Sequence, residues 1–112
     1  MIVQDEIVVL ITAPDEDEAA GIAKALVKSK LAACVNIIKG IRSIYSWRGN
    51  LADDSEVLMI VKTQMKLLDA LSVKTKEHHS YDVPEIIALP IAGGSKDYIK
   101  WLREYTEIKP GE

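Results

Sequence analysis

The chain contains one cysteine and no phenylalanine, and it has no hydrophobic run long enough to span a membrane. The single cysteine, Cys34, cannot form an internal disulfide, so the sequence does not require an oxidising compartment. The apolar stretch from Ile7 to Ile11 is too short for a signal peptide, and no basic segment precedes it. We therefore expect a cytoplasmic protein with no membrane partner.

An excess of positive charge is also missing. The formal net charge is -3, and acidic and basic residues are interspersed along the chain without forming a basic stripe. A protein that follows a phosphate backbone needs such a stripe. We therefore expect no nucleic-acid partner.

Common catalytic motifs are absent as well. The sequence has no phosphate-binding loop, no Gly-x-Ser-x-Gly elbow, no His-Glu-x-x-His motif and no paired-cysteine metal spacing. With 112 residues, of which 48% are hydrophobic, the chain has the size and composition of one soluble domain. We expect a single domain over residues 1–112 that is not an enzyme.

The chain does contain a regular succession of strand and helix patterns. An almost unbroken aliphatic run at 7–12 predicts a central strand buried on both faces. Asp15 is expected to cap the next helix, with Glu18 at the reciprocal position of a capping box. The buried stripe of that helix is predicted to contain Ala19, Ile22, Ala23, Leu26 and Val27.

The middle of the sequence predicts an unusually long hairpin. One strand is expected over 32–47 with a bulge at Gly40, followed by a turn at 48–50 and a returning strand over 56–63. A strand of about a dozen residues reaches about 40 Å, which exceeds what a domain of this size needs for its own sheet. We therefore expect the far end of the hairpin to contact another subunit.

The last third predicts a helix from Thr63 or Gln64 to about His78, a strand over 85–91 and a helix capped by Ser95. Pro90 cannot donate to a sheet, which favours either an edge position for that strand or a bulge at its end. The whole order is β-α-β-β-α-β-α. This order predicts an α+β, ferredoxin-like fold in which helices cover one face of an antiparallel sheet, with one additional C-terminal helix.

Several motifs in this order resemble those of the CutA family, over essentially the whole chain. The matching positions are Leu31 to Asn36, Ser43 to Gly49, Glu56, Lys62, Thr63, His79 to Ile86, Tyr98 and Trp101. The resemblance implies a ferredoxin-like subunit, a homotrimer built by the long hairpins, and association with copper and other divalent cations. The chain departs from the family at Ser80, where a proline is usual, and at Ile11, where some relatives carry a cysteine.

Candidate metal ligands are few. The resemblance implies a metal site at His78 and His79, and imidazole is a common ligand for copper and zinc. The alternative is that both are solvated or capping histidines at a helix end. Cys34 is either a soft ligand or, as its apolar neighbours favour, a small core residue. The carboxylates Asp53, Asp54 and Glu56 lack a recognisable cation-loop spacing, so a solvated cluster is the favoured interpretation.

Other family-matching positions are polar or aromatic, as is common at interfaces and in small-molecule clefts. Lys62 and Glu85 are expected either to pair or to bind an anion between subunits. Three functions remain open: a trimeric protein that binds divalent cations such as copper, a trimeric small-molecule sensor like the PII signalling proteins, and a structural trimer that is a stable platform for another protein. The predicted interface or cleft residues are Tyr45, Trp47, Glu56, Lys62, Tyr81, Pro84, Glu85 and Trp101.

Overall fold

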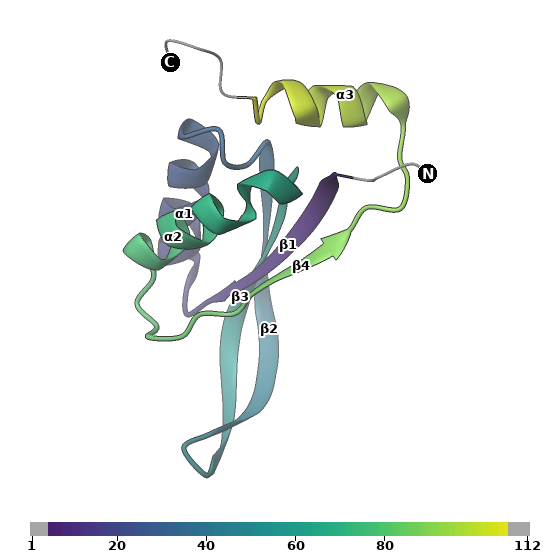
Figure 1. Ribbon diagram of the computed structural model, residues 1–112. Helices are drawn as coiled ribbons and strands as arrows, with labels where there is room; N and C mark the ends of the chain where they lie inside the picture. The colour runs from purple at the N-terminus through teal and green to yellow at the C-terminus, as the bar shows by residue number, and fades with distance from the viewer. Residues whose placement is uncertain (1–4, 108–112) are drawn as a thin grey trace.

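The computed structural model describes residues 5–107, so the ends of the predicted domain, 1–4 and 108–112, lie outside the described residues. A four-stranded antiparallel sheet has the strand order β2-β3-β1-β4 (Figure 1). This α+β architecture and the order of its elements confirm the prediction. The elements are β1 (Glu6–Ala13), α1 (Glu16–Lys28), β2 (Cys34–Trp47), β3 (Asn50–Gln64), a 3-10 turn (Met65–Leu67), α2 (Leu68–His78), β4 (Ile86–Pro90) and α3 (Lys96–Glu104).

The hydrophobic core lies between the sheet and the helices α1 and α2. Strand β1 is central, as predicted, because it pairs with β3 on one side and β4 on the other. Its side chains Val9 and Ile11 are fully buried, and they belong to the same core cluster as Ile22, Leu26 and Leu71 of the helices. Figure 1 shows α1 and α2 side by side over the sheet and α3 across one end of it.

Local capping largely follows the sequence. The side chain of Asp15 accepts a hydrogen bond from the Glu18 N–H at 2.8 Å, and that of Ser95 accepts one from the Tyr98 N–H at 3.1 Å. The predicted burial of Val27 is wrong, because this side chain is 43% exposed. Helix α2 begins at Leu68 rather than at residue 63 or 64, because β3 continues to Gln64.

The hairpin formed by β2 and β3 projects beyond the rest of the molecule (Figure 1). Its turn is tight because Arg48 and Gly49 both have positive φ angles, 51° and 79°, and Trp47 pairs directly with Asn50. The bulge predicted at Gly40 is confirmed by a register shift between Ile38 and Ile41. The returning strand starts at Asn50, earlier than the predicted residue 56, because even its polar first residues pair with β2.

Strand β4 occupies the edge of the sheet, where Pro90 was expected to place it. Pro90 is the last residue of this strand and lies opposite Ile7. Over residues 5–107, no helix is long and apolar enough to cross a membrane.

Candidate functional site

A cleft of about 750 Å³ lies between the hairpin and the loop that precedes β4. Five of the eight residues predicted for an interface or cleft line it, namely Tyr45, Trp47, Glu56, Tyr81 and Glu85. The fold brings them together because β2 and β3 supply one wall and residues 80–85 supply the other. The remaining lining residues are Thr12, Ser43, Ile44, Arg48, Ser80, Asp82 and Val83.

Glu56 is the most deeply placed carboxylate of the cleft. It lies on β3 and is only 6% exposed. The hydroxyl of Tyr81 donates a hydrogen bond to its Oε2 atom at 2.7 Å. Burial and this bond to Glu56 raise the pKa of Tyr81 well above the ordinary value of a phenol. The phenol therefore stays protonated and remains a donor to the carboxylate at physiological pH.

The other two carboxylates near the turn are paired with β2. The hydroxyl of Tyr45 donates to Asp54 at 2.6 Å, and this bond is the main cause of a raised pKa for Tyr45. Arg42 donates two hydrogen bonds to Asp53, at 2.8 and 2.7 Å, which lower the pKa of that carboxyl. Asp53 and Asp54 thus pair with β2 side chains, and Glu56 lies in the cleft. Asp53 and Asp54 are exposed, as the solvated interpretation expected, whereas the burial of Glu56 departs from it.

The charged side chains of the cleft are mainly acidic. Besides the buried Glu56, the exposed Asp82 and Glu85 line it. Among the described residues that line the cleft, Arg48 is the one with a positively charged side chain. Its guanidinium lies 5.5 Å from the centroid of the Trp47 ring. This imbalance gives the cleft a potential that attracts cations.

His79 is held by hydrogen bonds at both ring nitrogens. Its side chain is fully shielded from solvent, and its Nε2 atom lies 2.8 Å from the carbonyl oxygen of Thr12. Because a carbonyl only accepts, Nε2 carries the proton and Nδ1 is free to accept from the Tyr81 N–H at 3.1 Å. The ring has no lone pair left for a metal ion unless one of these bonds breaks. This arrangement corrects the expectation that His79 is available as a ligand.

His78 is exposed at the end of α2, so its role as a metal ligand stays a prediction. Within residues 5–107, no three side chains of the His, Cys, Asp or Glu type are arranged to hold a metal ion. The described residues therefore do not form a ready-made metal site with three or more side-chain ligands of these types.

Glu18 connects helix α1 to the cleft. The sequence predicted that its carboxylate would complete a capping box at the start of α1. Instead, its Oε2 atom accepts hydrogen bonds from the backbone N–H and the hydroxyl of Ser80, at 3.1 and 3.0 Å. This role could not be predicted from the sequence, because Glu18 and Ser80 are separated by 62 positions.

Three of the predicted residues do not line the cleft. Lys62 donates to the side-chain oxygen of Asn36, and it lies opposite Cys34 toward the other end of β3 from Glu56. The expected pair between Lys62 and Glu85 therefore does not form among the described residues. Trp101 lies on α3 between the rings of Tyr98 and Tyr105. Pro84 is buried and does not line the cleft.

Cys34 is half-buried at the start of β2 and is not part of the hydrophobic core. Its sulfur lies 3.9 Å from the Asn36 side-chain oxygen. Burial, together with the neighbouring Cys34, raises the pKa of Tyr98. The favoured interpretation of Cys34 as a core residue is wrong, because the buried run ends one residue earlier, at Ala33.

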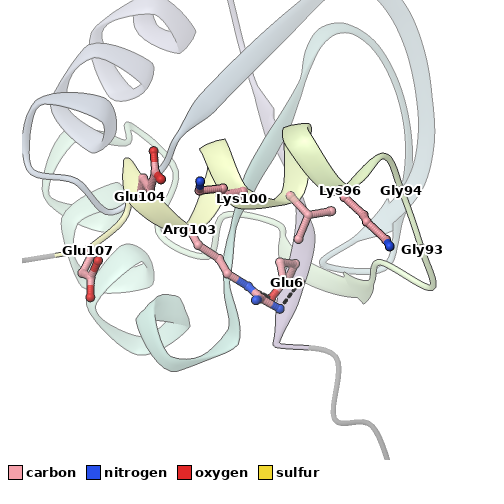
Figure 2. A pocket seen from close by; sticks show the side chains of 9 residues that line it. Glu6, Gly93, Gly94, Lys96, Lys100, Arg103, Glu104 and Glu107 are labelled. Carbon is pink, nitrogen blue, oxygen red and sulfur yellow. Dashed lines mark hydrogen bonds and ion pairs between the residues drawn. The ribbon is translucent and has the colours of Figure 1, made fainter.

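A second cavity, of about 430 Å³, lies between α3 and the start of β1 (Figure 2). Figure 2 shows Arg103 reaching Glu6, to which it donates hydrogen bonds at 3.1 and 3.0 Å. Glu6 is only 1% exposed, and its carboxylate raises the pKa of Arg103. The hydroxyl of Thr106 accepts a further bond from buried Gln64 at 2.7 Å. These contacts attach the C-terminal helix to the sheet, so we assign this cavity a structural role.

The family model described as CutA1 divalent ion tolerance protein matches residues 7–105. The chain is 54% identical over 101 residues to the divalent-cation tolerance protein CutA of Thermus thermophilus, covering 90% of this chain and 98% of that protein. It is 49% identical over 100 residues to the chloroplastic protein CutA of Arabidopsis thaliana, covering 89% of this chain and 55% of that protein. The chain thus spans nearly all of the bacterial relative and about half the length of the plant one.

Solved structures agree with the sequence matches. The divalent cation tolerance protein of Thermus thermophilus superposes with a TM-score of 0.89 at 53% identity, covering 91% of this chain and 99% of that one. The periplasmic divalent cation tolerance protein CutA of Archaeoglobus fulgidus superposes with a TM-score of 0.88 at 41% identity, covering 91% of this chain and 99% of that one. The names of the relatives include chloroplastic and periplasmic proteins, so the expected cytoplasmic location stays a prediction.

Proposed function

The chain belongs to the CutA1 divalent ion tolerance family, and on this premise we propose that it contributes to tolerance of divalent cations by binding them in the cleft beside the hairpin. The observation that carries this proposal is the acidic lining of the cleft. Glu56, Asp82 and Glu85 face a cavity of about 750 Å³ in which Arg48 is the cation among the described lining residues.

The chemistry of the lining favours a hard cation that keeps much of its hydration shell. Carboxylate oxygens suit magnesium, calcium and manganese, and magnesium commonly binds through one or two carboxylates and several waters. No three ligating side chains converge within residues 5–107, so we expect weak binding rather than a closed metal cage. Copper and zinc prefer imidazole, and we assign their binding to the exposed His78.

We propose that the protein acts as a homotrimer and that the hairpin contributes to assembly. Apolar side chains on the projecting hairpin support this, because Ile44 is 60% exposed and Leu51 is 80% exposed. Association would remove these surfaces from water. Native mass spectrometry is expected to detect a trimer at micromolar concentration, and a monomer there would contradict the proposal.

A second candidate function is small-molecule sensing in the same cleft, in the manner of the PII proteins. The specific observation in its favour is the wall of aromatic rings from Tyr45, Trp47 and Tyr81 around a cavity of about 750 Å³. Small-molecule sites typically have volumes of about 300–1,000 Å³ and aromatic linings. Both candidates describe a binding protein rather than an enzyme, and we retain the cytoplasm as its proposed location.

Calorimetric titration tests where the protein binds cations. Magnesium, zinc and copper would be titrated into wild type, an Asp82→Asn/Glu85→Gln variant and the matched control Asp69→Asn, which removes an exposed carboxylate from α2. We expect magnesium binding to be weakened only in the cleft variant. Unchanged magnesium affinity there would refute the cleft as the cation site. Copper and zinc binding is expected to fall in His78→Ala.

The sensor hypothesis needs its own experiment. A thermal-shift screen with nucleotides and small anions would be run on wild type and on Trp47→Leu, which removes one aromatic wall of the cleft. A compound that stabilises wild type but not the variant would favour the sensor. If no compound stabilises wild type, the cation hypothesis stands as the better account.

A further inference from the structure

The wall of the cleft at residues 80–85 is attached to helix α1 by one carboxylate. Oε2 of Glu18 accepts from the N–H and from the hydroxyl of Ser80, at 3.1 and 3.0 Å. The Glu18 side chain is only 19% exposed. Hydrogen bonds to a shielded, charged acceptor are stronger than neutral ones. The contact therefore joins two segments of the chain that are 62 residues apart.

Glu18 lies in the first turn of α1, a helix that is firmly packed against the core. Asp15 already caps α1 through the Glu18 N–H, so the carboxylate of Glu18 is not needed for capping. The helix that follows is anchored by Ala19, Ile22 and Leu26, which are at most 1% exposed. A carboxylate held in this way can fix the position of whatever binds to it.

The position of Ser80 in turn determines that of Tyr81. The Tyr81 N–H donates to Nδ1 of His79, and the two rings lie 4.8 Å apart between centroids. The Tyr81 hydroxyl then reaches the Glu56 carboxylate inside the cleft. The N–H groups of Ser80 and Tyr81 thus both donate to side chains rather than to a helix or a strand. This part of the wall depends on side-chain contacts for its order.

We propose that Glu18 is a positioning residue of the cleft: it clamps Ser80 and thereby holds Tyr81 and the acidic side chains of the wall in place. The claim that this clamp supports cation binding rests on the function proposed above. The clamp also explains how a serine at position 80 can hold this segment in place where the family usually has a proline. His79 has φ −98° and ψ 138°, which is the extended geometry that a following proline requires. A proline there would restrain the wall through its ring, whereas Ser80 restrains it through Glu18.

Amide hydrogen exchange measured by NMR tests the clamp without any ligand. The variants are Glu18→Ala, Glu18→Gln and Asp17→Ala, the last a matched control that removes an exposed carboxylate from the same helical turn. We expect the Ser80 and Tyr81 amides to exchange about ten-fold faster in Glu18→Ala and at the wild-type rate in the control. Glu18→Gln should recover part of the protection, because its amide oxygen still accepts. Equal exchange in Glu18→Ala and Asp17→Ala would overturn the proposal.

A proline background provides a second, independent comparison, which also applies if Glu18→Ala fails to fold. The Ser80→Pro substitution removes both groups that donate to Glu18, namely the N–H and the hydroxyl of Ser80. In this background, Glu18→Gln should therefore change the exchange rate of the Tyr81 amide by no more than about two-fold relative to Ser80→Pro alone. The same change in the serine background should have a clear effect. Equal effects of Glu18→Gln in both backgrounds would show that Glu18 acts through some group other than Ser80.

Magnesium affinity connects the clamp to the site. We expect about a ten-fold loss in Glu18→Ala and none in Asp17→Ala, with partial rescue in Glu18→Gln, while the thermal midpoints of Glu18→Ala and Asp17→Ala stay similar. Faster exchange with unchanged affinity would refute the role of the clamp in binding. If wild type binds no magnesium, the proposed function fails, and the exchange comparison still decides whether Glu18 holds the wall.

Discussion

The hydroxyl of Tyr81 donates to the buried carboxylate of Glu56 at 2.7 Å, which connects the loop before β4 to the strand β3 of the hairpin. This bond joins two residues that line the cleft, and it satisfies one oxygen of a side chain that is 6% exposed. The cleft therefore depends on a contact that neither segment can make alone.

Removal of the Tyr81 hydroxyl should destabilise the fold. In Tyr81→Phe, the Glu56 carboxylate keeps its burial and loses its donor, which is expected to cost about 1–3 kcal/mol of unfolding free energy. Urea denaturation would measure this cost. Tyr105→Phe is the control, because Tyr105 is 58% exposed directly after the end of α3. Equal stability of the two variants would show that the bond to Glu56 contributes nothing measurable.

The raised pKa of Tyr81 predicts a dependence of stability on alkaline pH. A group whose pKa is higher in the folded state stabilises that state, and the full contribution is present at pH values below the pKa of the unfolded state. For tyrosine this unfolded-state pKa is about 10. This contribution is lost as pH rises above that value, because the unfolded phenol ionises first. Absorbance titration at alkaline pH should therefore show that the last phenol to ionise in wild type is absent in Tyr81→Phe, whereas the smaller upward shifts of Tyr45 and Tyr98 remain. A wild-type titration in which every phenol ionises near the ordinary pKa would refute this prediction.

The bond between Arg103 and Glu6 should stabilise the docking of α3. Arg103→Ala leaves the Glu6 carboxylate buried without its two donors, and we expect a measurable loss of unfolding free energy. The loss should be modest because the side chain of Arg103 is 57% exposed and water can replace part of it. Lys100→Ala on the same helix serves as the control in denaturant titrations. A loss of equal size in both variants would contradict a specific role for the Glu6 contact.

Substitution of Gly49 in the hairpin turn should destabilise the protein. Its φ of +79° is unfavourable for a residue with a side chain, although a Cβ atom there would meet nothing within 4 Å. Gly49→Ala is therefore expected to cost about 1 kcal/mol through backbone strain alone. Gly93→Ala is the matched control, because that position is equally open and has no positive φ. Thermal unfolding of both variants would separate strain from packing.

Sequence patterns predicted those features that local chemistry determines. The aliphatic run of β1, the caps at Asp15 and Ser95 and the bulge at Gly40 depend on near neighbours, and the structure confirms them. The early start of β3 at Asn50 could not be predicted from its own polar residues, since pairing with β2 makes that segment a strand. Position in the assembled fold, rather than residue type, also decides the exposure of Val27.

The candidate site was predictable in part. Tyr45, Trp47, Glu56, Tyr81 and Glu85 were predicted to lie at an interface or in a ligand cleft, and in the single chain they line a cleft. Lys62 was assigned to the same group, but it lies on β3 opposite Cys34, away from that end of the strand. The contacts of Glu18 with Ser80 and of Glu6 with Arg103 span 62 and 97 residues. Contacts over such separations exist only after the sheet has brought the segments together.

The central claim is that divalent cations bind in the acidic cleft, and the most direct test is to locate a bound ion. Manganese can replace magnesium at oxygen ligands and broadens the NMR signals of nearby amides. The proposal predicts that substoichiometric manganese first broadens the amide signals of Glu56 and of the non-proline residues in 80–85, and that Asp82→Asn/Glu85→Gln reduces this effect. Broadening that begins around His78 or the exposed Asp69, and that the double substitution leaves unchanged, would contradict it.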